Sequence, residues 1–152
     1  MNKEWIIVSV IIFISIISCD REDFDDCFTP PETFMMMIVD KDTGEDLLDG
    51  KTYFTDSLEI YYFQNEERKN APFQIEHLNS YEKVITSEQL PWLSVGGNKK
   101  FYIQLNSIDT DTLYLHVAEY LHYCCRSYPY VEATINGNDI EMNYAGILLL
   151  EK

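Results

Sequence analysis

The sequence Phe-Tyr-Ile-Gln-Leu at residues 101–105 and the sequence Leu-Tyr-Leu-His-Val at residues 113–117 decide the expected fold. In each, apolar side chains alternate with polar or tyrosine side chains, and successive side chains of a strand point to opposite faces of its sheet. Both stretches are therefore predicted to be strands with one face toward a core. Asp109-Thr110-Asp111 is predicted to form the loop between them.

Outward from this pair, turn signals divide the chain into further short apolar segments. We expect strands at residues 33–39, 58–63, 73–75, 81–86, 130–135 and 145–150. Asn136-Gly137 favours a two-residue hairpin turn, after which the chain returns through residues 140–142. Asp49-Gly50 favours another such turn, between residues 47–48 and 52–54.

Two segments are predicted to lie outside the strands. The charged residues 65–70 are expected to form a loop, and residues 87–90 a single helical turn that ends before Pro91. Trp92 would then lie in a loop beside that proline.

Seven to nine short strands with almost no helical periodicity predict an all-β fold, an immunoglobulin-like β-sandwich over residues 32–152. The likeness to immunoglobulin domains is one of architecture only, because a tryptophan buried against an inter-sheet disulfide is not expected here. A β-barrel is the alternative. By length, the chain after residue 31 is one domain.

The first 26 residues differ in composition from the rest. Lys3 precedes an apolar run from Ile6 to Ile17, which is too short to span a bilayer core of ~30 Å and is followed by Ser18 and Cys19. Residues 1–18 are therefore predicted to be a signal peptide that is removed. Residues 19–31 are predicted to be a linker that carries a lipid on Cys19.

The string Ile16-Ile17-Ser18-Cys19 resembles a lipobox, and an acidic cluster follows it directly: Asp20, Glu22, Asp23, Asp25 and Asp26. This arrangement resembles the surface lipoproteins of Bacteroidota-type bacteria, where such acidic residues look like a signal for display on the outer face of the outer membrane. The mature segment also looks like small uncharacterised lipoproteins of these bacteria. The resemblance implies a palmitate-type anchor on Cys19 and an outer-membrane, cell-surface location.

The formal net charge is −15, from 26 acidic and 11 basic residues. Nucleic-acid binding depends on clustered Lys and Arg, and no basic face is visible in this sequence. We therefore expect no nucleic-acid partner, and attachment to a membrane only through the N-terminal lipid.

Three cysteines remain once Cys19 is acylated. In an oxidising compartment Cys27 is predicted to form a disulfide with Cys124 or Cys125, because a bridge between the two adjacent cysteines would distort the peptide. The alternative is that all three are reduced and buried. Adjacent cysteines are also poorly spaced for zinc.

The sequence predicts no cofactor. Asp40, Asp42 and Asp46 place carboxylates around the turn at Gly44, which is expected to be a solvated β-turn, with a weak Ca²⁺ site as the alternative. Asp109 and Asp111 would contribute to such a site if they lie at the same end of the sandwich.

No catalytic residue is predicted, and the protein is expected not to be an enzyme. His77, His116 and His122 lie in no nucleophile or metalloprotease motif, and a Cys–His pair near His122 would need a free thiol. A small hydrolase with two facing carboxylates is a remote alternative.

Tyrosines are the candidate binding residues: Tyr61, Tyr62, Tyr128 and Tyr130. Tyrosine offers a flat apolar ring with a polar tip, which suits binding of a sugar or a peptide, although cross-strand packing explains tyrosines in strands equally well. The main hypothesis is a binding or adhesion module for a glycan or protein partner. The alternative is a structural envelope lipoprotein. A coplanar exposed row of tyrosines favours the first, and fully packed tyrosines favour the second.

Overall fold

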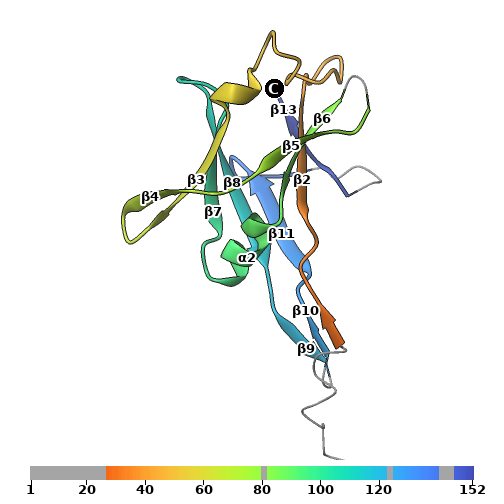
Figure 1. Ribbon diagram of the computed structural model, residues 1–152, viewed down its shortest axis with the longest axis vertical. Coiled ribbons are helices and arrows are strands. Elements are labelled where there is room, and N and C mark those ends of the chain that lie inside the picture. Colours follow the sequence, from red (N-terminus) through yellow and green to blue (C-terminus); the bar gives the residue numbers. More distant parts are fainter. Residues whose placement is uncertain (1–26, 80–81, 123–124, 141–145) are drawn as a thin grey trace, which may run out of the picture.

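The computed structural model describes residues 27–79, 82–122, 125–140 and 146–152, which contain thirteen strands, one α-helix and one 3-10 turn. The strands form three open sheets, two of which face each other (Figure 1). This confirms the predicted all-β sandwich, whereas the immunoglobulin-like detail stays a prediction. The strands outnumber the predicted seven to nine because several have only two or three residues.

The larger sheet has six strands in the order β12-β11-β8-β7-β3-β4, all antiparallel to their neighbours. Their bounds are β3 (Glu59–Gln64), β4 (Glu67–Asn70), β7 (Lys100–Gln104), β8 (Thr110–Val117), β11 (Tyr130–Ile135) and β12 (Asn138–Asp139). The two stretches that predicted the fold are the central strands β7 and β8. Their alternation is confirmed, since Phe101, Ile103, Leu113 and Leu115 are fully buried.

The smaller sheet has four strands in the order β13-β2-β6-β5, namely β2 (Phe34–Val39), β5 (Gln74–His77), β6 (Lys83–Ser87) and β13 (Leu148–Glu151). β13 runs parallel to β2, while β6 runs antiparallel to both β2 and β5. Phe34, Met36, Ile38 and Ile85 belong to the same buried cluster as the inward side chains of β7 and β8. Burial of each such side chain contributes about 1.5–3 kcal/mol, so this inter-sheet core holds the fold together.

The third sheet, which we call the finger, consists of residues 27–29, 120–122 and 125–127. β1 (Phe28–Thr29) pairs parallel with β10 (Cys125–Ser127), which pairs antiparallel with β9 (Tyr120–His122). The finger lies at one end of the long axis of the molecule (Figure 1). A disulfide joins Cys27 to Cys125, which confirms the predicted bridge and selects between its two partners. Cys124 lies outside the described residues.

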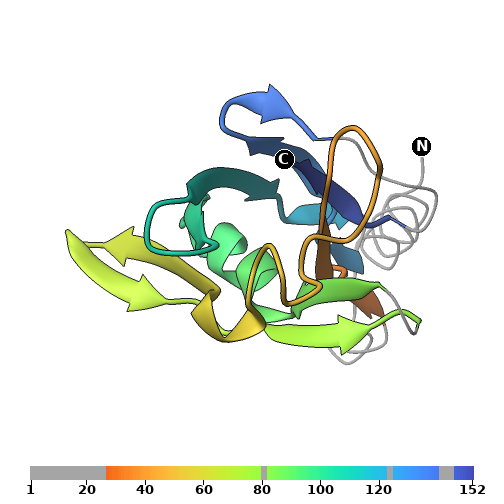
Figure 2. The same ribbon diagram turned by 90° about the horizontal axis from the view of Figure 1, so that it is seen from above.

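The helix α2 (Gln89–Val95) is longer than predicted and contains Pro91. The expected single turn before that proline was wrong, because a proline in the first turn of a helix removes an N–H that has no helical partner in any case. Trp92 consequently lies in the helix and not in a loop. The Ser94 hydroxyl donates to the Leu115 carbonyl oxygen at 2.8 Å and accepts from the Val117 amide at 2.9 Å, which fixes α2 against β8. Seen from above, α2 lies in the middle of the molecule (Figure 2).

The predicted hairpin around Asp49-Gly50 was also wrong. Residues 47–54 contain no strand and lead into the 3-10 turn Thr55–Ser57. The Asp49 carboxylate accepts hydrogen bonds from the Lys51 and Thr52 amides at 2.8 and 3.1 Å. An aspartate that binds the backbone ahead of it closes a local turn, so the flanking residues do not pair as strands.

A hairpin occurs instead at the charged residues 65–70, which were predicted to be a loop. Asn65 and Glu66 have φ values of 51° and 66° and connect β3 to β4. β4 is an edge strand, where charged side chains meet solvent, so charge did not exclude a strand here. This hairpin extends to one side of the molecule (Figure 2).

The Asn136-Gly137 hairpin was predicted correctly. Both residues have positive φ, 53° and 79°, and they join β11 to β12. The predicted return strand continues to residues 141–142, which lie outside the described residues. Asp109 precedes β8, but Thr110 and Asp111 belong to the strand and not to the predicted loop.

Candidate functional site: a groove and an aromatic face

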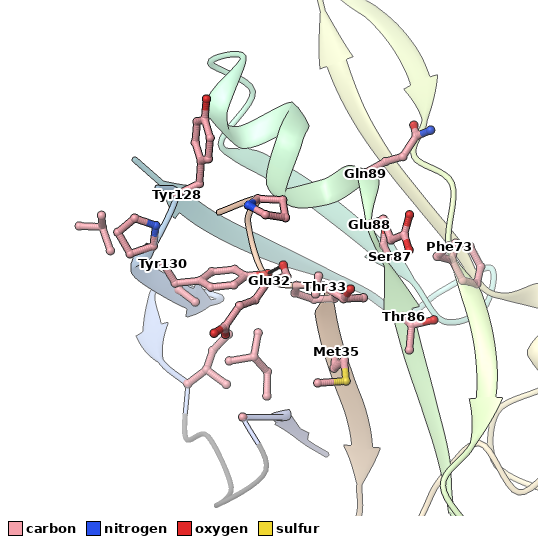
Figure 3. A pocket seen from close by; sticks show the side chains of 18 of the residues that line it. Glu32, Thr33, Met35, Phe73, Thr86, Ser87, Glu88, Gln89, Tyr128 and Tyr130 are labelled. Atoms are coloured by element: carbon pink, nitrogen blue, oxygen red, sulfur yellow. Dashed lines mark hydrogen bonds between the residues drawn. The ribbon is translucent and has the colours of Figure 1, made fainter. Parts of the chain in front are cut away.

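A groove of about 1300 Å³ lies between the two facing sheets (Figure 3). Its walls come from the start of β2, from β5 and β6, from the start of α2 and from β11. In Figure 3, Tyr130 and Glu32 lie on one side of the groove, while Phe73, Ser87 and Glu88 lie on the other, with Thr33 and Met35 between. Segments far apart in the sequence therefore share one concave surface.

The groove is acidic and partly apolar. Its charged lining side chains are Glu32, Glu76, Glu88 and Glu132, and no lysine, arginine or histidine occurs among its described lining residues. Thr86 donates a hydrogen bond to Glu76 at 3.1 Å, which holds one of these carboxylates in place. Met35 and Phe73 add apolar surface. Such a lining suits a ligand with apolar groups and positive charge and disfavours an anion.

Tyr130, a predicted binding residue, belongs to this groove. Its hydroxyl donates a hydrogen bond to the Glu32 carbonyl oxygen at 2.8 Å and so links β11 to the segment before β2. Burial raises the pKa of Tyr130 well above its usual range, and the Glu32 carboxylate raises it further. The phenol therefore stays protonated, and Tyr130 acts as a fixed part of the wall.

Two strand edges at the groove lack a strand neighbour among the described residues. β12 pairs with β11 only at Thr134 and Ile135, which leaves residues 130–133 without a partner on that side. β13 pairs with β2 only from Met36 onward. Phe34 and Met35 therefore have no described strand partner on the β13 side of β2. Residues of both stretches line the groove. Backbone groups along an unpaired edge can bind an extended segment as an added strand.

Tyr61 lies on a different surface, which we call the aromatic face: Tyr61, Phe63 and Tyr102 on the outer side of the six-stranded sheet. The Tyr61 and Tyr102 rings stack with centroids 5.1 Å apart and planes within 12°, and Phe63 meets both rings edge-on. Arg68 lies 3.8 Å above the Tyr61 ring and pairs with Glu59, and Lys100 lies 5.2 Å from the centre of the Tyr102 ring. The Tyr61 and Tyr102 rings thus contact each other, and each also has a cation over it. The three aromatic rings do not form a coplanar row.

Tyr62 and Tyr128 are packed. Tyr62 meets the buried Phe101 ring edge-on at 6.1 Å, and Tyr128 is 7% exposed and packs against Trp92 and Phe28. The four predicted tyrosines are therefore not one site. Tyr130 belongs to the groove, and the mostly buried Tyr128 also lines it. Tyr61 belongs to the aromatic face, and Tyr62 contributes mainly to packing.

Two of the three carboxylates considered for calcium, those of Asp40 and Asp46, accept hydrogen bonds from the backbone. Asp40 accepts hydrogen bonds from the Thr43 amide and hydroxyl and from the Asp42 amide, which lower the pKa of Asp40. Asp46 accepts from the Leu48 and Lys83 amides, both at 2.8 Å. In the described ranges, no three His, Cys, Asp or Glu side chains come together as a set of metal ligands.

Asp109 and Asp111 do lie at the end of the sandwich that carries the Asp40 turn, since the Lys41 amide donates to the Lys152 carbonyl oxygen at 2.9 Å. The Lys152 ammonium contacts Asp109 Oδ1 at 2.8 Å and Asp111 Oδ2 at 2.6 Å, so it balances charge on both carboxylates. Burial opposes the charge on Asp109, but hydrogen bonds from Lys152 and Tyr53 outweigh it and lower the pKa of Asp109. Burial and the bond to Asp109 raise the pKa of Tyr53 to about 12.

The histidines are dispersed. His77 lies in the edge strand β5, His116 on the outer face of β8 and His122 in the finger. Cys125 is bonded to Cys27, so it supplies no thiol nucleophile beside His122.

The predicted export and anchoring residues lie outside the described residues: Cys19, Asp20, Glu22, Asp23, Asp25 and Asp26. Within the described part of the chain, no helix has the length and apolar character needed to cross a membrane.

Comparison of the chain with protein-family models, with curated proteins and with solved structures found no match. The sequence interpretation missed the groove because its walls come from residues 29–35, 72–76, 86–89 and 127–133, which no local pattern connects. The one sequence signal was the clustering of tyrosines near residue 130.

Proposed function

We propose that this chain is a lipid-anchored envelope protein, displayed at the cell surface, whose groove binds an extended, basic and apolar segment of a protein partner. The observation that carries the proposal is the acidic groove bordered by two strand edges that have no strand neighbour among the described residues. An extended segment can add main-chain hydrogen bonds along these edges, while its lysine or arginine side chains meet the glutamates.

A protein partner is favoured over a glycan by the geometry of the tyrosines. Sugar rings stack on flat aromatic surfaces that are open to solvent. On the aromatic face, Arg68 covers Tyr61 and the two stacked rings cover each other. The rings of the aromatic face therefore already contact one another and Arg68. The groove, in contrast, carries negative charge that no described lining residue balances.

The anchor and the location rest on the sequence. The lipobox-like string that ends at Cys19 supports acylation, and the acidic residues after it support display on the outer membrane. Acyl chains would supply the membrane affinity that so acidic a chain otherwise lacks.

The second candidate is a structural envelope lipoprotein without a ligand. The packing of Tyr62 against the buried Phe101 ring and the burial of Tyr128 favour it, because both tyrosines contribute to the stability of the domain.

The test is a selection of random peptides displayed on phage against the full mature protein. We expect enriched peptides that alternate apolar residues with lysine or arginine. Replacing both Glu32 and Glu132 by lysine should weaken their binding about tenfold or more, which corresponds to about 1.4 kcal/mol. The matched control replaces Glu45 and Glu151, two exposed glutamates outside the groove, and should leave binding unchanged.

Equal loss in both double variants would show that only the net charge matters and would contradict the groove. A selection that enriches no peptide, together with binding to a glycan array, would replace the protein partner by a saccharide. If the protein bound neither peptides nor glycans, the binding proposal would be wrong and the structural role would be favoured.

A further inference from the structure

The finger differs in composition from the rest of the chain. Its strands β1, β9 and β10 contain no aspartate or glutamate, although the chain has 26 acidic residues. They present large apolar side chains to solvent, with Phe28 47%, Tyr120 53% and Leu121 62% exposed. A cluster of solvent-exposed aromatic and aliphatic side chains on a protein surface indicates an interaction site.

The register of the finger shows how these side chains are arranged. Phe28, Arg126 and Leu121 lie side by side across its three strands and therefore point to the same face. Trp92 of α2, which is 41% exposed, extends this face, because its ring stacks on Phe28 with centroids 6.2 Å apart and planes within 6°. The result is an apolar and aromatic patch with one cation at its centre.

The cation is available for a second role. Arg126 pairs with Glu119 at 2.9 Å, but both side chains are about half exposed, and an exposed ion pair is weak enough to exchange for another anion. An arginine flanked by exposed apolar side chains, here Phe28 and Leu121, suits the surface of a bilayer, where phosphate groups lie next to the hydrocarbon.

The position of the finger indicates what this surface is. Cys27 belongs to the finger, is fixed to it by the disulfide and follows Cys19 by eight positions. Eight residues span at most about 28 Å when fully extended. A lipid on Cys19 would therefore hold the finger, and not the far end of the sandwich, close to the bilayer.

We propose that the finger and Trp92 dock into the headgroup region of the phospholipid membrane that holds the N-terminal lipid. The proposal rests on the anchoring at Cys19 proposed above. Tryptophan and other aromatic side chains favour the membrane–water interface, and Arg126 contacts lipid phosphate there. Docking at this end gives the domain a defined orientation on the membrane, with the finger down and the sandwich outward (Figure 1).

The test uses the mature lipidated protein, from which residues 1–18 have been removed, reconstituted into vesicles of phosphatidylcholine and phosphatidylglycerol at about four to one. Trp5 is the only other tryptophan and lies in the segment expected to be removed, so Trp92 reports alone in the mature chain. Phospholipids brominated along the acyl chain quench tryptophan that reaches the interface. We expect about a twofold loss of Trp92 emission in brominated vesicles relative to unbrominated ones.

Variants assign the quenching to the finger. Leu121→Ser and Phe28→Ser should each restore most of the emission, with the disulfide and thermal midpoint measured alongside. Leu121 is largely exposed, so its replacement keeps the finger folded if Phe28→Ser does not. Phe63→Ser is the matched control, because Phe63 is 50% exposed on the aromatic face. It should leave the quenching unchanged.

The outcomes separate this inference from the proposed function. Mass spectrometry of the purified protein first establishes whether Cys19 carries acyl chains, and an unmodified Cys19 would overturn the anchor and the docking together. An acylated protein whose Trp92 is not quenched would overturn the docking and leave the anchor intact. Equal effects of Phe63→Ser and Leu121→Ser would likewise overturn the assignment to the finger.

Discussion

The groove and the aromatic face both expose aromatic side chains, but they differ in how far their interactions are already satisfied. On the aromatic face, Tyr61 and Tyr102 stack on each other, and Arg68 covers the ring of Tyr61. In the groove, no lysine or arginine accompanies the four glutamates among the described lining residues. Two strand edges there also have no strand neighbour in the part of the chain that the structure describes. Exposure of tyrosine is therefore a weaker indicator of binding than unpaired charge and unpaired backbone in a concave surface.

Loss of the disulfide should have the largest effect on the groove, because the bridge joins Cys27 to β10 within the finger, and Thr29 and Ser127 of the finger line the groove. Cys27→Ser should lower the free energy of unfolding by about 2–5 kcal/mol, since the bridge closes a loop with a sequence separation of 98. It should also free the Cys125 thiol for labelling and weaken peptide binding in the groove. Urea unfolding measures the stability change.

The wild-type protein under reducing conditions is the control for this variant and should fall to the same stability. A Cys27→Ser protein as stable as its parent would contradict the role of the bridge. Peptide mapping without reductant that finds Cys27 unpaired would contradict the bridge itself.

The ion pairs of Lys152 with Asp109 and Asp111 are a third region, in which the charges of neighbouring side chains balance each other. Lys152→Met leaves Asp111, which is 3% exposed, without the ammonium that lies 2.6 Å away. We expect a loss of about 2 kcal/mol of stability, less than for a fully buried pair because Asp109 and Lys152 are partly exposed. Thermal or urea unfolding at neutral pH measures it, and Lys41→Met, which alters an exposed lysine at the same end, is the control.

The pH dependence sharpens this prediction. The pKa of Asp109 is lowered by folding, so its contribution is complete above its unfolded pKa near 3.8 and is lost as the pH falls through the folded value. The pKa of Lys152 is raised, because the bonds to Asp109 and Asp111 outweigh burial, so its contribution is lost only as the pH rises through a value above 10.5. The stability of Lys152→Met should therefore fall less than that of the wild type between pH 5 and pH 2. An identical acid dependence of the two proteins would contradict the ion pairs.

These elements also show how much could be predicted from the sequence. β7 and β8 were predicted because period-two alternation is a local signal, and the Asn136-Gly137 hairpin because its turn needs residues that tolerate positive φ. The finger was not predicted, since strands of two or three residues show no period and depend on a distant disulfide.

Charge misled the interpretation of residues 65–70, where side chains that suit a loop also suit an edge strand. The Asp49-Gly50 turn signal was real, but the Asp49 carboxylate bound the backbone ahead of it and no pair of strands followed. The groove depends on contacts across the whole chain, so single residues such as Tyr130 could be singled out while the surface could not.

The smallest effect is expected on the aromatic face. Arg68→Gln removes a cation from above Tyr61 and an exposed ion pair with Glu59. Stability should change by no more than about 0.5 kcal/mol, and peptide binding in the groove should not change. If Arg68→Gln abolished peptide binding, the aromatic face and not the groove would be the binding surface.

Hydrogen exchange of the backbone amides, with and without a selected peptide, tests the central claim most directly. If the peptide adds as a strand in the groove, amides within residues 130–133 and at Phe34 and Met35 should exchange more slowly in the complex. Amides of Tyr61 and Tyr102, within the six-stranded sheet, should be unaffected. Protection confined to the strands of the aromatic face, or no protection at the two groove edges, would contradict the proposal that this protein binds its partner by strand addition in the acidic groove.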